Sequence, residues 1–140
     1  GHNVQIGYFA QNQADYLDGE KTILDTMLDE ARDSNRSKVR DMLGSFLFRG
    51  DEVDKKVKVL SGGERNRLAL CKLMLQPFNV LIMDEPTNDL DFETISWLEN
   101  FLANYENTVI VVSHDRHFLD AVCTHISDID FGKISHYSPP

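Results

Sequence analysis

The sequence predicts an α/β fold in which a mostly parallel β-sheet is combined with a helical subdomain. Two apolar runs carry this prediction, residues 80–83 and the β-branched residues 108–112. Continuous apolar runs of this length are typical of buried parallel strands, which deliver the residues that follow them to the carboxyl edge of a sheet. Apolar residues at helical spacing before, between and after the two runs indicate the helices of the fold.

The expected elements follow one another along the whole chain. Residues 4–10 are expected to form the first strand, and residues 11–20 a polar loop. The other elements are expected, in chain order, as helices over 22–32, 37–48 and 61–76, a strand over 80–85, a helix over 93–105, a strand over 108–113, a helix over 116–123, and a hairpin of 126–129 with 134–137. Pro77 ends the third helix, because its ring cannot continue a helix.

Residues 60–64 (Leu-Ser-Gly-Gly-Glu) present backbone N–H groups to an anion. Ser61 precedes Glu64 by three residues, which is the spacing of a capping box, so a helix is expected to start at Ser61. The N–H groups and partial positive charge of a helix N-terminus favour phosphate oxygens, and Gly62 and Gly63 allow close approach of the backbone. Taken alone, such a capping box is most often only the start of a helix.

The two apolar runs each end in side chains that suit phosphate chemistry. Asp84 is expected to hold Mg²⁺ through water, and Glu85 to orient or deprotonate an attacking water molecule. His114 follows the second run and can contact a γ-phosphate. Each motif alone could be structural, as a solvated turn or a satisfied histidine. In this order they indicate that the chain handles the γ-phosphate of a nucleotide.

The motifs together resemble the ATP-binding cassette of the ABC-F family, from the Q-loop onward. The resemblance rests on the signature over 60–64, the Walker B stretch over 80–85, the D-loop over 88–91, the switch segment over 113–120, and the strand and glutamine of the Q-loop over 6–11. Glu64, and the Asp-Arg pair after His114, resemble ABC-F proteins rather than membrane transporters. The resemblance implies a partial nucleotide-binding domain over 1–140, with a helical arm over about 15–60 and the signature helix, Walker B, D-loop and switch over 61–140.

The resemblance also implies ligands and roles for individual residues. Two cassettes would enclose two ATP molecules, and each cassette would act on one nucleotide and cap the other. The catalytic residues implied are Glu85, His114 and Gln11, and the metal-binding residues are Asp84 and Gln11. The cofactor-binding residues implied are Ser61, Gly62, Gly63, Glu64 and Asp91. Of these, Ser61 and Gly63 would bind the γ-phosphate of the nucleotide held by the partner. The implied cofactors are ATP and Mg²⁺, and the implied partner is a second ABC cassette.

The phosphate loop G-x-x-x-x-G-K-[ST] does not occur in this sequence. The one Gly-Lys pair, Gly132-Lys133, is followed by Ile134 and lacks the earlier glycine. In the family this loop lies upstream of the Q-loop, so the chain is expected to be a fragment of an ABC-type ATPase and inactive by itself. The strand of the phosphate loop would neighbour residues 108–112. This edge is therefore expected to pair with an unexpected segment of the chain, or to form a dimer or strand-swapped oligomer.

The net charge of −9 is unevenly distributed along the chain. The window 32–67 holds ten basic and six acidic residues, which gives it a net charge of +4. The charge pattern by itself favours an ordinary solvated face on two helices, and the resemblance to ribosome-acting translation factors raises the expectation that this window touches ribosomal RNA. With no apolar stretch near 18 residues, and with Cys71 and Cys123 outside any C-x-x-C spacing, a cytoplasmic protein without membrane contact is expected.

Other function classes fit the sequence less well. A DNA-repair ATPase of the Rad50 or SMC type would need a long heptad insertion between Gln11 and Leu60, where only 49 positions separate the two residues. A membrane transporter cassette is disfavoured by Glu64 and by the Asp-Arg pair after His114. A fragment without nucleotide function stays possible. The choice between a translation factor and an antibiotic-resistance protein is not decided by these residues.

Overall fold

The computed structural model describes residues 5–10, 12–87, 90–106, 108–122, 125–129 and 132–137, with side chains described up to Val122. These residues divide into two compact units. We call residues 12–76 the helical unit and the remainder the sheet unit. Each unit is described by itself. Within the described residues, no helix has the length and apolar character needed to cross a membrane.

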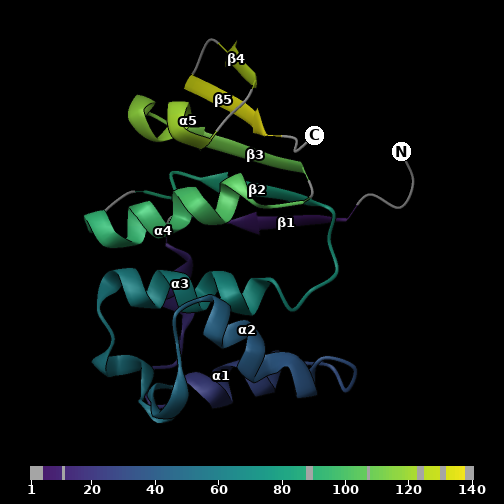
Figure 1. Ribbon diagram of the computed structural model, residues 1–140, viewed down its shortest axis with the longest axis vertical. Helices are drawn as coiled ribbons and strands as arrows, with labels where there is room; N and C mark the ends of the chain where they lie inside the picture. The colour runs from purple at the N-terminus through teal and green to yellow at the C-terminus, as the bar shows by residue number, and fades with distance from the viewer. Residues whose placement is uncertain are drawn as a thin grey trace. The chain divides into compact units, whose positions relative to one another are not determined.

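The described residues of the sheet unit form a five-stranded sheet in the order β1-β2-β3-β5-β4 (Figure 1). The first three, β1 (Ile6–Phe9), β2 (Val80–Asp84) and β3 (Thr108–Ser113), are parallel. The last two, β4 (His125–Ile129) and β5 (Gly132–Tyr137), form an antiparallel hairpin. The α/β prediction with a parallel sheet is confirmed, and the expected hairpin is present.

The second edge of β3 is paired within the chain. β5 runs antiparallel to β3, with Val109 opposite Tyr137 and Ser113 opposite Lys133. We expected residues 108–112 either to recruit an unexpected segment of the same chain or to associate with another molecule. The structure shows the first outcome, because the C-terminal hairpin supplies the backbone hydrogen bonds that an open edge lacks.

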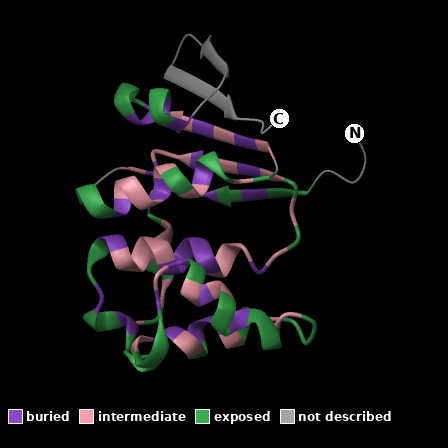
Figure 2. Cartoon of the chain, in the orientation of Figure 1, coloured by how far each residue is buried: buried purple, intermediate pink, exposed green. Residues whose placement is uncertain are grey.

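The two faces of the parallel strands differ in burial (Figure 2). On one face Leu81, Met83 and Val109 are fully buried, and the core of this unit also takes in Leu98 of α4 (Phe92–Ala103) and Phe118 of α5 (Arg116–Val122). The alternate residues of the strands are half-buried or exposed. The continuous apolar runs predict burial on both faces, and in this structure only one face is buried.

The helix α4 buries a narrower stripe than its apolar spacing predicts. Thr94, Leu98 and Leu102 are its buried residues. Trp97 and Phe101 of this helix are half-buried, and their stacked rings have centroids 5.3 Å apart. Because the stacked rings shield part of each other's surface from water, they need less contact with the core.

The helical unit consists of three α-helices and four short 3₁₀ turns. The helices are α1 (Ile23–Glu30), α2 (Val39–Ser45) and α3 (Gly62–Leu73). The turns are η1 (Gln13–Tyr16), η2 (Arg36–Lys38), η3 (Gly50–Asp54) and η4 (Val57–Val59). Their apolar side chains form the core of the unit, in which Ile23, Met27, Leu43, Leu68 and Cys71 are completely buried. Each such aliphatic side chain contributes about 1.5–3 kcal/mol through burial.

The helices are shorter than predicted, and the backbone shows why for α2. Leu47 has φ 70°, in the left-handed region, so the helix expected over 37–48 ends at Ser45. A non-glycine residue in that region cannot continue a right-handed helix. The boundary between the two units lies after Gln76. α3 lies with the arm helices because its buried residues, Leu68 to Cys71, pack in the core of the helical unit.

Candidate functional site

Asp84 and Glu85 lie where β2 gives way to a sharp turn. Glu85 has φ 49°, in the left-handed region, which costs a non-glycine residue about 1–2 kcal/mol. Its backbone N–H donates to the carbonyl oxygen of Val112 at 2.7 Å, so the turn stays attached to the neighbouring strand. This strained turn carries the Glu85 carboxylate toward the end of β3. Strain of this kind is found where a structure holds a side chain in a fixed place.

His114 meets Glu85 across the ends of β2 and β3. Nδ1 of His114 lies 2.5 Å from Oε1 of Glu85, and the backbone N–H of His114 donates to Oε2 at 3.4 Å. The carboxylate is largely covered, with 25% of the side chain exposed, whereas the imidazole is 80% exposed. The pair therefore combines a held carboxylate with a histidine that an incoming ligand can reach. Parallel pairing of the two strands brings these residues together.

Asp84 is held from the other side. The hydroxyl of Tyr8 on β1 donates to Oδ2 of Asp84 at 2.8 Å. This hydrogen bond to a carboxylate raises the pKa of the Tyr8 phenol above its ordinary value, with desolvation and the negative charge of Asp84 adding to the effect. No sequence motif marks Tyr8. The parallel register of β1 and β2 places it opposite Ile82 and hence on the same face as Asp84.

Ser113 and Asp115 fix the turn that carries His114. Oδ1 of Asp115 accepts from the N–H of Phe118 at 3.0 Å, which caps the start of α5. The hydroxyl of Ser113 accepts from the N–H of Asp115 at 3.0 Å. On the β2 side, the hydroxyl of Thr87 donates to Oδ2 of Asp115 at 3.5 Å. The two turns that present Glu85 and His114 are therefore joined by side-chain contacts.

The carboxylates here suit Mg²⁺ that arrives with a nucleotide. Among the described residues, no group of three or more His, Cys, Asp or Glu side chains could hold a metal ion by itself. Mg²⁺ in phosphoryl-transfer sites takes one or two carboxylates and completes its shell with phosphate oxygens and water. Asp84, which ends β2, fits that donor set. Gln11, expected to join it, lies outside the described residues, as do Asn88 and Asp89 of the D-loop.

The N-terminus of α3 has the capping box predicted from the sequence. The hydroxyl of Ser61 accepts from the N–H of Glu64 at 3.2 Å, and the N–H of Ser61 donates to Oε1 of Glu64 at 2.9 Å. Glu64 is thus engaged in closing the helix end. Gly62 and Gly63 follow as the first two helical residues, whose N–H groups have no acceptor within the helix itself. A Cβ atom added at Gly62 would meet nothing within 4 Å, so the space before it is open.

Asp91 precedes α4 in the N-cap position and is exposed. It is the one residue of the expected D-loop, other than Leu90, that the structure describes. Its extended backbone turns the chain into α4, whose first residue, Phe92, is 84% exposed. The assignment of Asp91 to nucleotide binding stays a prediction.

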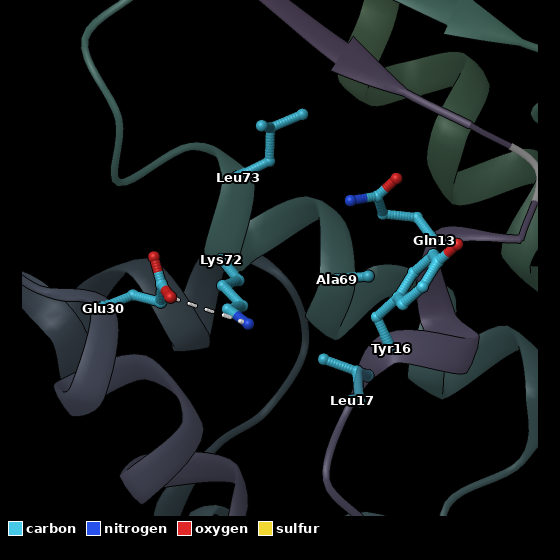
Figure 3. A pocket seen from close by; sticks show the side chains of 7 residues that line it. All are labelled: Gln13, Tyr16, Leu17, Glu30, Ala69, Lys72 and Leu73. Atoms are coloured by element: carbon cyan, nitrogen blue, oxygen red, sulfur yellow. Dashed lines mark ion pairs between the residues drawn. The ribbon is translucent and has the colours of Figure 1, made fainter.

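The helical unit contains an open cavity that the sequence analysis did not anticipate. Its volume is about 240 Å³, and it is lined by residues of η1, α1 and α3 and of the segment just after η1 (Figure 3). Nζ of Lys72 and Oε1 of Glu30 form an ion pair at 3.8 Å on its wall. The lining residues come from three separate stretches of sequence, so no local pattern marked the cavity.

The basic window is mostly solvated. Eight of its ten basic side chains are exposed, namely Arg32, Arg36, Lys38, Arg40, Arg49, Lys55, Lys56 and Lys58. Lys56 and Lys58 both pair with Glu20, at 3.4 and 3.1 Å. Arg67 is used within the fold, because its guanidinium lies over the Phe48 ring at 5.1 Å and donates to the carbonyl oxygen of Phe46.

Comparison with known proteins places these motifs in a family. The family model described as ABC transporter matches residues 2–88. ABC transporter F family member 5 of Arabidopsis thaliana is 42% identical over 137 residues, which are 98% of this chain and 20% of that protein. The putative ATP-binding protein YdiF of Bacillus subtilis (strain 168) is 47% identical over 137 residues, 98% of this chain and 21% of that protein. The ATP-binding protein Uup of Escherichia coli (strain K12) is 43% identical over 142 residues, 98% of this chain and 22% of that protein.

The chain thus spans about a fifth of the length of these relatives. Among solved structures, the dimeric bacterial ABC transporter cassette MJ0796 matches with a TM-score of 0.63 and 22% sequence identity. The match covers 85% of this chain and 56% of that cassette. At this identity the likeness concerns the fold, which is that of an ABC cassette.

Proposed function

Because the chain belongs to the ABC transporter family, with relatives in its F branch, we propose that it is part of an ATP-binding and ATP-hydrolysing cassette of an ABC-F protein. The observation that carries the proposal is the Glu85–His114 pair at the ends of two neighbouring parallel strands. A carboxylate beside a histidine at such an edge suits proton removal from a water molecule next to a phosphate.

This geometry supports the roles proposed for Glu85, His114 and Asp84, whereas those proposed for Gln11 rest on its motif alone. Glu85 accepts the proton of the attacking water, and its strained turn holds the carboxylate in place. His114 is bonded to Glu85 through Nδ1 and reaches the γ-phosphate with its exposed ring. Asp84 and Gln11 hold Mg²⁺, which when bound neutralises charge on the phosphate oxygens. Gln11 also takes part in catalysis.

The helical unit serves the nucleotide of a second cassette. Gly62 is exposed with open space beside it, and it begins a 12-residue helix whose first N–H groups and dipole favour an anion. Ser61 and Glu64 shape this end through the capping box. For Asp91, which lies in the sheet unit, nucleotide binding is proposed separately. The solved cassette MJ0796 is a dimer, which supports a second cassette as the partner.

The phosphate loop is supplied by the longer protein that we propose. Without that loop, this chain binds ATP weakly, because most contacts to the β- and γ-phosphates are missing. The intact protein is then the ATPase. We place it in the cytoplasm.

Replacing Glu85 by Gln in the full-length protein tests the proposal. The amide cannot accept a proton, so ATP hydrolysis should fall by about 10²–10⁴-fold while ATP binding stays within about twofold. Steady-state phosphate release and nucleotide titration give the two values. Glu106→Gln, at an exposed glutamate after α4, is the matched control and should hydrolyse ATP at the unaltered rate. Hydrolysis by Glu85→Gln at the parental rate would refute the assignment.

A second partner, ribosomal RNA, is proposed for the basic window 32–67. The exposed basic side chains support it, although a solvated face has the same appearance. Charge reversal of Arg32 and Arg40 should weaken ribosome binding and flatten its salt dependence. Reversal of Lys56 and Lys58, which already pair with Glu20, should do less. If both variants bind the ribosome as the unaltered protein does, the basic window is an ordinary solvated face and the proposed contact with ribosomal RNA is wrong. A role in translation or antibiotic resistance depends on this partner.

A further inference from the structure

Tyr8 and Asp84 are linked across two strands of the sheet unit. In the parallel register Tyr8 lies opposite Ile82, and Asp84 comes two residues later on the same face of the sheet. The phenol spans this diagonal, and its hydroxyl donates to Oδ2 of Asp84 at 2.8 Å. The bond therefore depends on the pairing of β1 with β2 and on an aromatic side chain of this length.

The bond engages one oxygen of a carboxylate that has two. A hydroxyl that donates to an ionised carboxylate forms a stronger bond than a neutral pair does. It holds the Asp84 side chain in one orientation and leaves Oδ1 as an acceptor. Groups that bond to metal-holding carboxylates fix their geometry, and their loss typically lowers metal affinity by about 10–100-fold.

We propose that Tyr8 is a positioning residue for the magnesium site, in which its hydroxyl holds Asp84 by Oδ2 and leaves Oδ1 to metal-bound water. This inference rests on the proposed function, since it takes Asp84 as the metal-binding residue. Nothing in the sequence motifs assigns such a role to Tyr8. The ring itself packs on a half-exposed sheet face, so loss of the hydroxyl leaves the packing in place.

A purely structural role makes a different prediction. Tyr8 is 50% exposed, and an exposed hydrogen bond contributes little to folding stability. If the role of the hydroxyl were purely structural, its loss in Tyr8→Phe would lower the urea midpoint of unfolding and leave the metal affinity unchanged. A positioning Tyr8 changes metal affinity and leaves turnover at saturating Mg²⁺ nearly unaltered.

The test compares Tyr8→Phe with Tyr16→Phe and Asp84→Ala in the full-length protein. Tyr16→Phe removes a hydroxyl from a tyrosine that is 74% exposed in the helical unit. Mn²⁺ affinity is measured by electron paramagnetic resonance in the presence of a non-hydrolysable ATP analogue. We expect about tenfold weaker Mn²⁺ binding for Tyr8→Phe, a larger loss for Asp84→Ala and no change for Tyr16→Phe. In ATPase assays, the Mg²⁺ concentration for half-maximal rate should rise about tenfold while kcat stays within about twofold.

The outcomes separate this inference from the proposed function. Wild-type Mn²⁺ affinity in Tyr8→Phe, together with a loss in Asp84→Ala, overturns the inference and leaves the proposed metal site intact. Unaltered affinity in Asp84→Ala overturns the metal site itself. If Tyr8→Phe does not fold, Tyr8→Leu, which also removes the hydroxyl that bonds to Asp84, replaces it in the Mn²⁺ measurement. About tenfold weaker Mn²⁺ binding is expected again, and wild-type affinity overturns the inference.

Discussion

The two regions proposed to handle phosphate are built in opposite ways. At the start of α3, Ser61 to Glu64 make their own structure, because every bond of the capping box joins residues three apart. At the sheet edge, Tyr8, Asp84, Glu85 and His114 come from three strands that meet only when the sheet forms. The helix end therefore depends on local sequence, whereas the sheet edge depends on the core that holds the strands together. Mutations in the sheet core should damage the second site and leave the first intact.

The largest expected effect concerns the 140-residue chain by itself. With no phosphate loop in the sequence, neither region grips a nucleotide alone, so Mg-ATP should bind weakly and turn over negligibly. Isothermal titration calorimetry of the chain with Mg-ATP measures this. Micromolar affinity with measurable hydrolysis would mean that the start of α3 and the sheet edge are enough to bind and hydrolyse ATP. That result would contradict the proposal that the chain is an inactive fragment.

Next in size is the loss of a core side chain beneath the sheet edge. Met83 is fully buried on β2, directly before Asp84 and Glu85, so Met83→Ala should reduce the free energy of unfolding by about 2–5 kcal/mol. Ile82→Ala, on the half-buried face, is the control and should cost less. Urea denaturation followed by circular dichroism gives both values. Equal losses would mean that the two faces of the sheet are covered alike.

A smaller effect is expected at the capping box. Ser61→Ala removes the hydroxyl that accepts from the N–H of Glu64, which should cost about 1 kcal/mol of stability. Thr22→Ala is the matched control, because Thr22 caps α1 through the N–H of Asp25 at 3.0 Å. Both variants should lose similar stability, measured by thermal unfolding. In the full-length protein only Ser61→Ala should lower ATP hydrolysis; an equal effect of Thr22→Ala would make Ser61 a cap and nothing more.

The smallest effect concerns Cys71 in the core of the helical unit. Burial raises the pKa of its thiol above the ordinary value. A raised folded-state pKa gives stability that is present below the unfolded pKa, about 8.5, and is lost as pH rises above it. The free energy of unfolding should therefore fall by about 0.8 kcal/mol between pH 7 and pH 9. Cys71→Ala lacks this component, and urea midpoints at the two pH values measure it; the same pH slope in both proteins would count against a buried thiol.

The local features were predictable from the sequence to a greater extent than the non-local ones. The cap at Ser61 and the whole of β3 have the predicted bounds, because spacing and β-branched runs act over a few residues. The early end of α2 was not predictable, since no pattern marks the left-handed backbone of Leu47. The Tyr8–Asp84 bond needs the order of the strands, and the cavity needs three separate segments, so both became visible only with the fold.

A double-mutant cycle tests the central claim, that Glu85 and His114 act as one catalytic unit. Single-turnover ATP hydrolysis is measured for the full-length protein and for its Glu85→Gln, His114→Ala and doubly substituted variants. Residues that act together lose their effect together, so the double variant should be no slower than Glu85→Gln alone, within about twofold. Independent, multiplying losses would contradict the account, because they would mean that the 2.5 Å contact between the two side chains has no part in the reaction.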